Sequence, residues 1–375
     1  MSQQLRILYL ANAQSIHTQR WVGWFAKRHD VRLLSSPPFA SGVWGCPDIQ
    51  LAEGSIRKIL PRVDSLRTLH YLKSTIRDFR PNIVHAHFLA PNAWIAAASG
   101  FKPFVTTTWG SDMLQVSVLY TILNRWAIHR ANLNTADSQE MVDRLITLGV
   151  QTDKAALIQH GVDTDIFKPG NAGDRLRNKL NIPDNAIIIF SPRALSSIYN
   201  IPTIIQSVAD LVKDFPNLHL VLLRFNADQT TESEILTIAK KTGFSERLHM
   251  LNGLPHADMP GAYQMSSVVV SVPNSDTTPV SLLEAMACQT SIIATDLPSI
   301  REWIQPNISG WLVPPKDVAA LRQALKTALL QPPNMKEVMV ARNRQQVITR
   351  ASLDVHMTKM ETCYRQLLAQ SPLLS

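Results

Sequence analysis

Short apolar runs alternate with helix-length amphipathic stretches along the chain. Strands are expected where a short apolar run stands between turn residues, and helices where apolar residues recur every three or four positions. In the first part of the chain the predicted elements are strands at 5–10, 31–35, 83–86, 104–107 and 133–136, and helices at 18–27, 90–98 and 139–148. Strands that alternate with helices in this way predict parallel βα units and a doubly wound α/β domain.

A polar, turn-rich segment at 160–170 interrupts this rhythm and reads as a connection between domains. After it the predicted elements are strands at 186–190, 218–223, 249–251, 268–272 and 291–294, and helices at 202–214, 232–242, 281–287 and 317–330. A chain of 375 residues also exceeds what one hydrophobic core usually serves. We therefore predict two α/β domains, 1–168 and 169–352, with a C-terminal amphipathic helix within 353–375 that packs back on the first domain.

The composition is that of a globular protein, with 45% hydrophobic and 18% charged residues. No apolar run is long enough to span a bilayer, and the opening stretch at 5–11 is too short for the apolar region of a signal peptide. Three cysteines, Cys46, Cys288 and Cys363, stand too far apart for a disulfide framework or a zinc spacing. We expect a cytoplasmic protein without a structural metal.

The net charge of +8 is concentrated in the first half of the chain. Residues 1–168 hold 18 Lys and Arg against 12 Asp and Glu, a net +6, and the remaining residues hold 19 against 17, a net +2. Such a bias suits anionic lipid, nucleic acid or a phosphorylated substrate, although extra surface charge most often serves solubility. No nucleic-acid partner is expected.

The segment 65–79 carries an apolar stripe at helical spacing. Its apolar members are Leu66, Leu69, Leu72 and Ile76, with Arg67, Lys73 and Arg77 on other faces. An ordinary helix packed on the sheet has the same spacing and is the simpler interpretation. Combined with the basic first half, the stripe also supports the hypothesis of weak peripheral binding to anionic lipid at the inner face of the membrane.

The segment 271–284, SVPNSDTTPVSLLE, is the strongest site candidate. A buried strand ends there, a loop carries Asp276, and a helix begins near Pro279, where proline favours the first helical turn. In parallel α/β sheets, ligands bind beyond the carboxyl ends of strands, and a helix N-terminus offers unpaired N–H groups to a diphosphate. The candidate contacts to such a ligand are Asp276, Thr277, Thr278, Pro279, Val280 and Glu284. Taken separately, Asp276 is also an ordinary turn residue and Glu284 a residue that complements the helix dipole.

Asp276 and Glu284 are separated by seven positions, and Glu284 lies inside LEAMA at 283–287. This arrangement resembles the signature of glycosyltransferase family 4, a family of retaining enzymes with the GT-B fold. The resemblance extends over almost the whole chain and includes SIHTQRW at 15–21, VHAHF at 84–88, WGSD at 109–112 and HGVDTDIFKP at 160–169. Each of these motifs is weak alone, and together they are specific.

The resemblance assigns roles to charged residues of the second domain. Glu284 matches the acid that contacts the donor's ribose, and Asp276 matches the acid near the transferred sugar, where the family usually has Glu. Arg193 matches the Arg that stabilises the leaving diphosphate, a task suited to a planar guanidinium. The family's Lys five positions later is absent, because position 198 is Ile, and Arg224 is a candidate substitute.

In the first domain, the resemblance implies that His87 lies beside the donor sugar, while His85 reads as a hydrogen-bonded core residue. His17 and Asp112 are candidates for the acceptor side. His17 stands at a helix start, where a histidine is more often only exposed, and Asp112 either holds an acceptor hydroxyl or caps the following helix. The first βα turn, ANAQS at 11–15, lacks the glycines of a dinucleotide site, which weighs against a dehydrogenase.

These observations predict a GT-B architecture, in which two doubly wound Rossmann-like domains face each other across a cleft. The expected function is that of a retaining hexosyltransferase that moves a sugar from a nucleotide-sugar donor to a glycan or lipid-linked acceptor, in the synthesis of a cell-surface polysaccharide or glycolipid. No cofactor or metal is expected, because Arg193 and helix termini supply positive charge. Two alternatives remain, a GT-B nucleotide-sugar epimerase and a non-catalytic nucleotide-sugar-binding subunit. The sequence does not specify the sugar, the base, the acceptor, the linkage or the oligomeric state.

Overall fold

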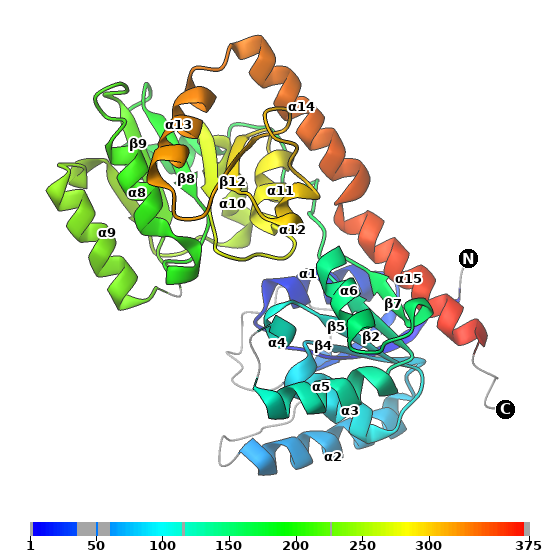
Figure 1. The fold of residues 1–375 in the computed structure, drawn as a ribbon. Helices are drawn as coiled ribbons and strands as arrows, with labels where there is room; N and C mark the ends of the chain where they lie inside the picture. The colour runs from blue at the N-terminus through cyan, green and yellow to red at the C-terminus, as the bar shows by residue number, and fades with distance from the viewer. Residues whose placement is uncertain (1–2, 36–49, 52–60, 115–116, 226, 371–375) are drawn as a thin grey trace. The chain divides into compact units, whose positions relative to one another are not determined.

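The computed structural model of the chain describes residues 3–35, 50–51, 61–114, 117–225 and 227–370. Its contacts divide the chain into two compact units (Figure 1). Unit 1 comprises Met1–His160 and Leu353–Ser375, and unit 2 comprises Gly161–Ser352. Residues 161–168, which the prediction placed in the first domain, lie in unit 2, because Val162 and Phe167 are buried in the core of that unit.

Unit 1 is built on a seven-stranded parallel sheet in the order β3-β2-β1-β4-β5-β6-β7. Its strands are β1 Arg6–Leu10, β2 Asp30–Leu34, β3 Gln50–Leu51, β4 Ile83–His87, β5 Phe104–Thr108, β6 Leu133–Ala136 and β7 Ala155–Leu157. The strand order reverses between β1 and β4, which is the doubly wound arrangement that was predicted. Side chains alternate between the two faces, so that Leu8 joins the core on one face while Ile7 and Tyr9 join the core on the other.

Helices cover both faces of this sheet. They are α1 Ile16–Ala26, α2 Pro61–Phe79, α3 Trp94–Ser99, α4 Ser111–Leu114, α5 Val118–Arg130, α6 Gln139–Thr147 and α15 Leu353–Gln370. On one face α3 contacts both α2 and α5, and the opposite face is covered by α1 and α15 (Figure 1). The apolar side of α2 packs on the sheet, since Leu72 is fully buried and Leu69 and Ile76 are partly buried against the same core. The stripe proposed to bind lipid is therefore largely used in the core, as the simpler interpretation expected.

Unit 2 is built on a six-stranded parallel sheet in the order β10-β9-β8-β11-β12-β13. Its strands are β8 Ile187–Ser191, β9 Leu218–Leu223, β10 Leu248–Leu251, β11 Val268–Ser271, β12 Ser291–Thr295 and β13 Trp311–Val313. Its helices are α7 Gly173–Lys179, α8 Ile201–Ala209, α9 Gln229–Lys241, α10 Met259–Gln264, α11 Val280–Ala287, α12 Pro298–Arg301, α13 Val318–Leu329 and α14 Pro333–Arg350. The predicted α/β class is thus confirmed for both units. Within the described ranges, no helix combines the length and the hydropathy that a bilayer crossing requires.

The helix α14 occupies a stretch for which the sequence pattern predicted no element. Asn343, fully buried in its middle, donates from Nδ2 to the carbonyl of Ser309 at 2.7 Å. Arg344 donates to the carbonyl of Ala287 at the end of α11, at 2.6 Å, and to the carbonyl of Phe167 at 3.1 Å. The helix is thus held by these polar contacts as well as by the buried Met339, Val340 and Val347, and hydrophobic periodicity does not reveal the polar part.

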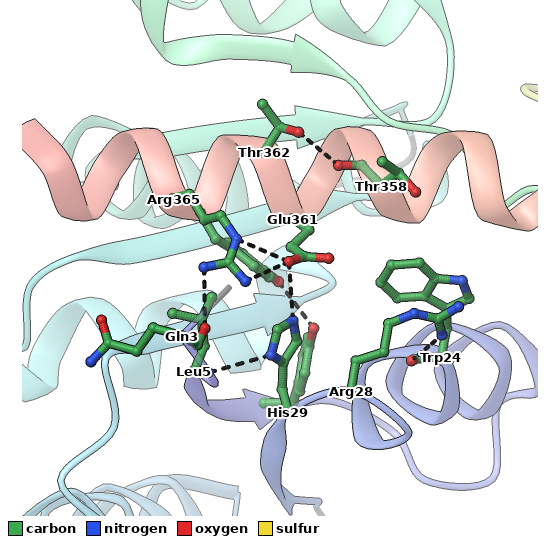
Figure 2. A network of polar contacts seen from close by, with 11 residues as sticks. Gln3, Leu5, Trp24, Arg28, His29, Thr358, Glu361, Thr362 and Arg365 are labelled. Atoms are coloured by element: carbon green, nitrogen blue, oxygen red, sulfur yellow. Dashed lines mark hydrogen bonds and ion pairs between the residues drawn. The ribbon is translucent and has the colours of Figure 1, made fainter. Parts of the chain in front are cut away.

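The last helix, α15, packs on unit 1 through a buried apolar face and a polar network (Figure 2). Arg365 binds the Glu361 carboxylate of the same helix at 2.6 and 2.9 Å and donates to the carbonyl of Gln3 at 3.2 Å. Glu361 also lies 3.5 Å from Nε2 of His29, whose Nδ1 accepts the N–H of Leu5 at 3.3 Å. Burial lowers the pKa of His29, and Glu361 opposes that shift. The network joins α15 to the segment that enters β1 and to the segment that precedes β2.

The hydroxyl of Tyr364 connects α15 to the interior of the sheet. It lies 3.0 Å from the hydroxyl of Tyr9 on β1 and hydrogen bonds to Nδ1 of His85 on β4. Nε2 of His85 bonds to Oγ1 of Thr107 on β5 at 2.6 Å. All four side chains are fully buried. Through Tyr364, connected hydrogen bonds therefore link α15 to the three strands β1, β4 and β5.

Replacing Tyr364 with Phe should destabilise unit 1. Tyr364→Phe removes the hydroxyl and leaves buried polar atoms of Tyr9 and His85 with one partner fewer, which costs about 1–3 kcal/mol. Urea denaturation would measure the change in the free energy of unfolding. Tyr120→Phe is a matched control, because Tyr120 is 45% exposed, and its effect should stay within about 0.5 kcal/mol. Equal losses in the two variants would show that the Tyr364 hydroxyl does not hold α15 on the sheet.

Candidate functional site

The loop between β11 and α11 carries the predicted acidic residue of unit 2. Asn200 donates from Nδ2 to the carbonyl of Val272 at 2.8 Å and to Oδ1 of Asn274 at 2.9 Å. The hydroxyl of Ser299 donates to the carbonyl of Asp276 at 2.7 Å. These contacts hold the loop that carries Asp276. The loop follows the carboxyl end of β11, and this is the edge of a parallel sheet at which ligands bind.

Arg193, two residues after β8, reaches this loop. Its Nη2 lies 2.6 Å from Oδ2 of Asp276, and its Nη1 donates to the hydroxyl of Ser281 in the first turn of α11 at 3.2 Å. Its guanidinium also stacks over the ring of Tyr199 at 4.4 Å. Among the described residues, Nε of Arg193 has no hydrogen-bond partner. The structure thus brings Arg193 and Asp276 together at the start of α11.

Arg193 and Asp276 form a largely buried ion pair, with side chains 13% and 14% exposed. Burial raises the pKa of Asp276, and the charge of Arg193 opposes that shift together with the N–H of Thr277, which lies 3.1 Å from Oδ1. Removing one member of such a pair leaves the other charge desolvated, which is strongly destabilising. The pair places a guanidinium beside a carboxylate at the carboxyl edge of the sheet.

Glu284 lies in α11 with its carboxylate buried. The hydroxyl of Tyr263 donates to its Oε2 at 2.9 Å, and Nε2 of His256 lies 3.8 Å from its Oε1. Burial raises the pKa of Tyr263 well above its ordinary value and Glu284 raises it further, so the phenol keeps its proton and remains a donor. The sequence does not single out Tyr263 or His256, because they belong to no motif and meet α11 only in the fold.

The other predicted contacts of this segment form the turn into α11. Pro279 is the N-cap residue of the helix, and the N–H of Val280 donates to the carbonyl of Thr278 at 2.8 Å. The N–H of Thr277 is bonded to the Asp276 carboxylate. These groups therefore shape the turn, and their contact with a ligand stays a prediction.

Arg224, the candidate substitute for the missing Lys, is engaged by α9. Its Nε and Nη2 lie 3.0 and 2.7 Å from the carboxylate oxygens of Glu232. Neither Arg193 nor Asp276 is among its contacts in the described part of the chain. Position 198 carries Ile198, whose carbonyl accepts the N–H of Asn274 at 2.8 Å. A role for Arg224 at the phosphate therefore stays a prediction.

No cluster of three or more His, Cys, Asp or Glu side chains suited to a metal occurs within the described ranges. The positive charge at this site comes from Arg193 and from the dipole of α11, whose N-terminal end is positive, while the N–H of Val280 is already bonded to Thr278.

A cluster of aromatic rings gathers at the carboxyl edge of the sheet in unit 1. The rings of His17 and His160 are stacked with centroids 4.3 Å apart, and Trp109 lies 5.2 Å from His160. The ring of His87 lies 5.9 Å from Trp109 and 5.0 Å from Trp21. These side chains come from the four motifs on which the resemblance rests outside α11. The fold therefore brings together segments that lie far apart in the sequence.

His87, the last residue of β4, is buried, and neither of its ring nitrogens has a hydrogen-bond partner among the described residues. Burial lowers the pKa of His87 to about 3, so the ring is neutral at physiological pH. A neutral imidazole can donate one hydrogen bond and accept another. His85 has both nitrogens bonded, to Tyr364 and Thr107, and is the core histidine that was predicted. Of the two histidines, His87 is the one whose nitrogens have no partner among the described residues, and its contact with a ligand stays a prediction.

His160 and Asp137 add a polar pair to which the sequence assigned no role. Nε2 of His160 lies 3.8 Å from Oδ2 of Asp137, and both side chains are buried. Burial, followed by the neighbouring His17 and His87, lowers the pKa of His160 well below its ordinary value. His160 opens the motif HGVDTDIFKP, which was the only sequence signal for it.

Asp112 orders the loops that carry the ring cluster. Its carboxylate accepts the N–H of Leu89 at 2.9 Å and the N–H of Trp109 at 3.0 Å. Burial raises the pKa of Asp112 to about 6. Between His87 and Leu89, Phe88 adopts a φ of 71°, a region that costs energy for a bulky residue and often marks functional sites. The observed contacts are those of a residue that fixes two loops, and contact between Asp112 and an acceptor stays a prediction.

Two family models match the chain. Residues 173–346 match the model described as glycosyl transferases group 1, and residues 6–138 match the model described as glycosyl transferase 4-like. The D-inositol 3-phosphate glycosyltransferase 1 of Catenulispora acidiphila is 22% identical over 212 residues, which cover 55% of this chain and 50% of that protein. The D-inositol 3-phosphate glycosyltransferase of Corynebacterium jeikeium is 22% identical over 280 residues, which cover 66% of this chain and 64% of that protein. The matched stretch thus spans less than two thirds of either relative.

Solved structures with the same fold cover nearly the whole chain. A glycosyltransferase from Rickettsia africae has a TM-score of 0.84 at 18% identity and covers 98% of this chain and 100% of that one. The Anabaena protein HepE, solved with UDP and glucose, has a TM-score of 0.80 at 17% identity and covers 97% of this chain and 100% of that one. These neighbours establish the fold of the chain as the two-domain α/β fold called GT-B.

Acidification should destabilise unit 1 in part through His87. Burial holds the pKa of His87 at about 3 in the folded chain, against 6.5 for an unperturbed histidine. The unfolded chain therefore binds one more proton between these values, and stability that is present above pH 6.5 is lost as the pH falls. From pH 6.5 to pH 5, protonation of this one ring in the unfolded chain should lower the free energy of unfolding by about 2 kcal/mol.

Urea denaturation of the wild type and of His87→Gln, at neutral pH and at pH 5, measures this loss. His87→Gln cannot titrate, so it should lose about 2 kcal/mol less than the wild type on acidification. The same pH dependence in both proteins would contradict a buried, neutral His87.

Proposed function

We propose that this chain is a glycosyltransferase that moves a sugar from a nucleotide-sugar donor to a glycan or lipid-linked acceptor, with retention of configuration at the anomeric carbon. The observation that carries the proposal is the buried pair of Arg193 and Asp276 at the start of α11, the helix that also holds Glu284. The descriptions of both matching family models support it. A cation and a helix N-terminus suit the diphosphate of a nucleotide sugar, and carboxylates accept hydrogen bonds from sugar hydroxyls.

On the donor side, the site offers different groups to the phosphates, the ribose and the sugar. The guanidinium of Arg193 and the positive end of the α11 dipole suit the diphosphate. Glu284, held by Tyr263, is proposed to accept hydrogen bonds from the ribose hydroxyls, and Asp276 from the transferred sugar. The Anabaena protein HepE was solved with UDP-glucose, which makes uridine diphosphate sugars the first donors to test.

In the proposed reaction, the bond between the anomeric carbon and the diphosphate oxygen breaks while the acceptor oxygen bonds to the same face of that carbon. The proton of the acceptor hydroxyl passes to an oxygen of the departing diphosphate. Arg193 stabilises the negative charge that develops on the leaving group. His87 is proposed to hold a sugar hydroxyl through its two unpaired nitrogens, and His17 to contact the acceptor. No step is assigned to a metal or a cofactor.

The biological setting is proposed on the resemblance of the motifs alone. It comprises a cytoplasmic location and a role in the synthesis of a cell-surface polysaccharide or glycolipid.

One observation favours a second function, that of a nucleotide-sugar-binding subunit without turnover. Ile198 supplies no cation, and Arg193 is already paired with Asp276. Incubating the chain with UDP-sugars and lipid extracts, with chromatographic detection of UDP, separates the two functions. Release of UDP that depends on the extract supports transfer, and donor binding without UDP release supports the subunit. A changed sugar without any acceptor would instead indicate an epimerase.

Replacing Arg193 should lower turnover more than donor affinity. Arg193→Ala removes positive charge where negative charge grows toward the transition state, so kcat should fall by about a hundredfold or more, with a smaller change in KM. Steady-state kinetics with a UDP-sugar that the chain is found to bind would measure kcat and KM. Arg322→Ala is a matched control, since Arg322 is an ion-paired arginine on α13, 3.6 Å from Asp210. A loss confined to KM would contradict the role of Arg193 at the leaving group.

Substitutions of the two acidic residues should have different effects, one mainly on nucleotide binding and the other mainly on turnover. Glu284→Gln should weaken the binding of a nucleoside diphosphate by about tenfold, because a carboxylate accepts hydroxyl hydrogen bonds more strongly than an amide. Asp276→Asn should lower turnover more than it lowers nucleoside diphosphate binding, because its proposed partner is the sugar, which that ligand lacks. Calorimetric titration with UDP and steady-state kinetics would measure these effects. If Asp276→Asn abolished UDP binding while Glu284→Gln left it unchanged, the assignment of the pair would be wrong.

A further inference from the structure

The solvent-facing side of α5 is apolar. Val118, Leu119 and Ile122 are 79%, 63% and 59% exposed, and Trp126 is 39% exposed. Positions 118, 122 and 126 are spaced four apart and therefore form one stripe along the helix, with Leu119 beside it. Surface helices of globular proteins normally present polar residues on this side. A continuous exposed apolar stripe of this kind marks an interaction surface.

The polar contacts of α5 fix this orientation. Asn124 is buried on the opposite side, where its Oδ1 accepts the indole N–H of Trp94 at 2.9 Å and its Nδ2 donates to the carbonyl of Asp112 at 2.9 Å. The ring of Tyr120 lies 5.0 Å from that of Trp94. Rotating the helix to bury Ile122 would break both hydrogen bonds of Asn124. The outward position of the apolar stripe is therefore built into the packing of α5 on α3.

The charges around the stripe are positive. The sequence of α5 contains no acidic residue, and Arg125 and Arg130 on it are exposed. The guanidinium of Arg130 lies over the ring of Trp126 at 5.4 Å, and Lys102 contacts the carbonyl of Arg130. The one acidic residue of the neighbouring α4, Asp112, is buried. An apolar stripe with a cationic rim complements an anionic surface that has an apolar interior.

We infer that α5 docks on an anionic lipid bilayer. The helix lies in the plane of the membrane, with Val118, Leu119 and Ile122 at the boundary between headgroups and acyl chains. Trp126 sits at the interface that indole rings favour, and the exposed arginines meet lipid phosphates. The helix is roughly 20 Å long, so it lies on the bilayer and does not cross it. This surface stands on α5 alone and does not depend on the proposed sugar transfer.

The test is flotation of the full chain with vesicles of phosphatidylcholine, with and without phosphatidylglycerol. The wild type should bind the vesicles that contain phosphatidylglycerol, more weakly at high salt, and bind pure phosphatidylcholine less. The variant Val118→Ser/Leu119→Ser/Ile122→Ser should lower the partition coefficient by about tenfold. The variant Arg125→Gln/Arg130→Gln should lower binding to the anionic vesicles and leave the weaker binding to neutral vesicles unchanged.

A matched control comes from unit 2. Leu330→Ser/Val338→Ser changes side chains that are 63% and 71% exposed, comparable to Leu119 and Val118, and should leave vesicle binding unchanged. Circular dichroism checks that each variant keeps its fold. The inference is overturned if the wild type does not bind the anionic vesicles, or if the α5 variants bind as it does. It is also overturned if light scattering shows that the triple serine change converts a dimer into a monomer with vesicle binding retained, because α5 would then join two copies.

Discussion

Every strand of the two described sheets runs parallel to its neighbours, and this constraint decides where each unit can hold functional side chains. A parallel sheet gathers the carboxyl ends of its strands at one edge, where the chain turns into helices whose first N–H groups have no partner within the helix itself. In unit 1, His87 ends β4 and Trp109 follows β5. In unit 2, Arg193 follows β8 and Asp276 follows β11. The ring cluster and the ion pair are therefore two results of the same architecture.

Burial acts on these two groups in different ways. In unit 1 the side chains are imidazoles, which respond to desolvation by losing their charge, so His87 and His160 are neutral donors and acceptors. In unit 2 an arginine cannot lose its proton, so burial is accommodated by a direct bond to Asp276. Neutral imidazoles suit uncharged hydroxyls, whereas a fixed guanidinium suits a phosphate. The chemistry proposed for each unit follows from which ionisable groups it buries.

The sequence predicted those features whose signal is local. Apolar runs gave most strands, and the spacing of Asp276 and Glu284 gave the acidic pair at α11. The pattern missed α14, because its buried side chains include polar ones, and missed α5, because apolar residues occur on both of its sides. For the stripe on α2, amphipathic spacing alone does not say whether the apolar side meets lipid or a sheet, and the structure supports the simpler interpretation for most of the stripe. Tyr263 could not be found at all, because its bond to Glu284 exists only in the fold.

The surface of α5 and the ring cluster are linked by a short series of contacts. Asn124, on the inner side of α5, bonds to the carbonyl of Asp112, and the Asp112 carboxylate bonds to the N–H groups of Leu89 and Trp109. Trp109 is itself part of the ring cluster. A helix that rests on a bilayer through its outer side would thus hold, through its inner side, the loop that presents this cluster. The proposed membrane docking and the proposed acceptor binding would then depend on one connected set of hydrogen bonds.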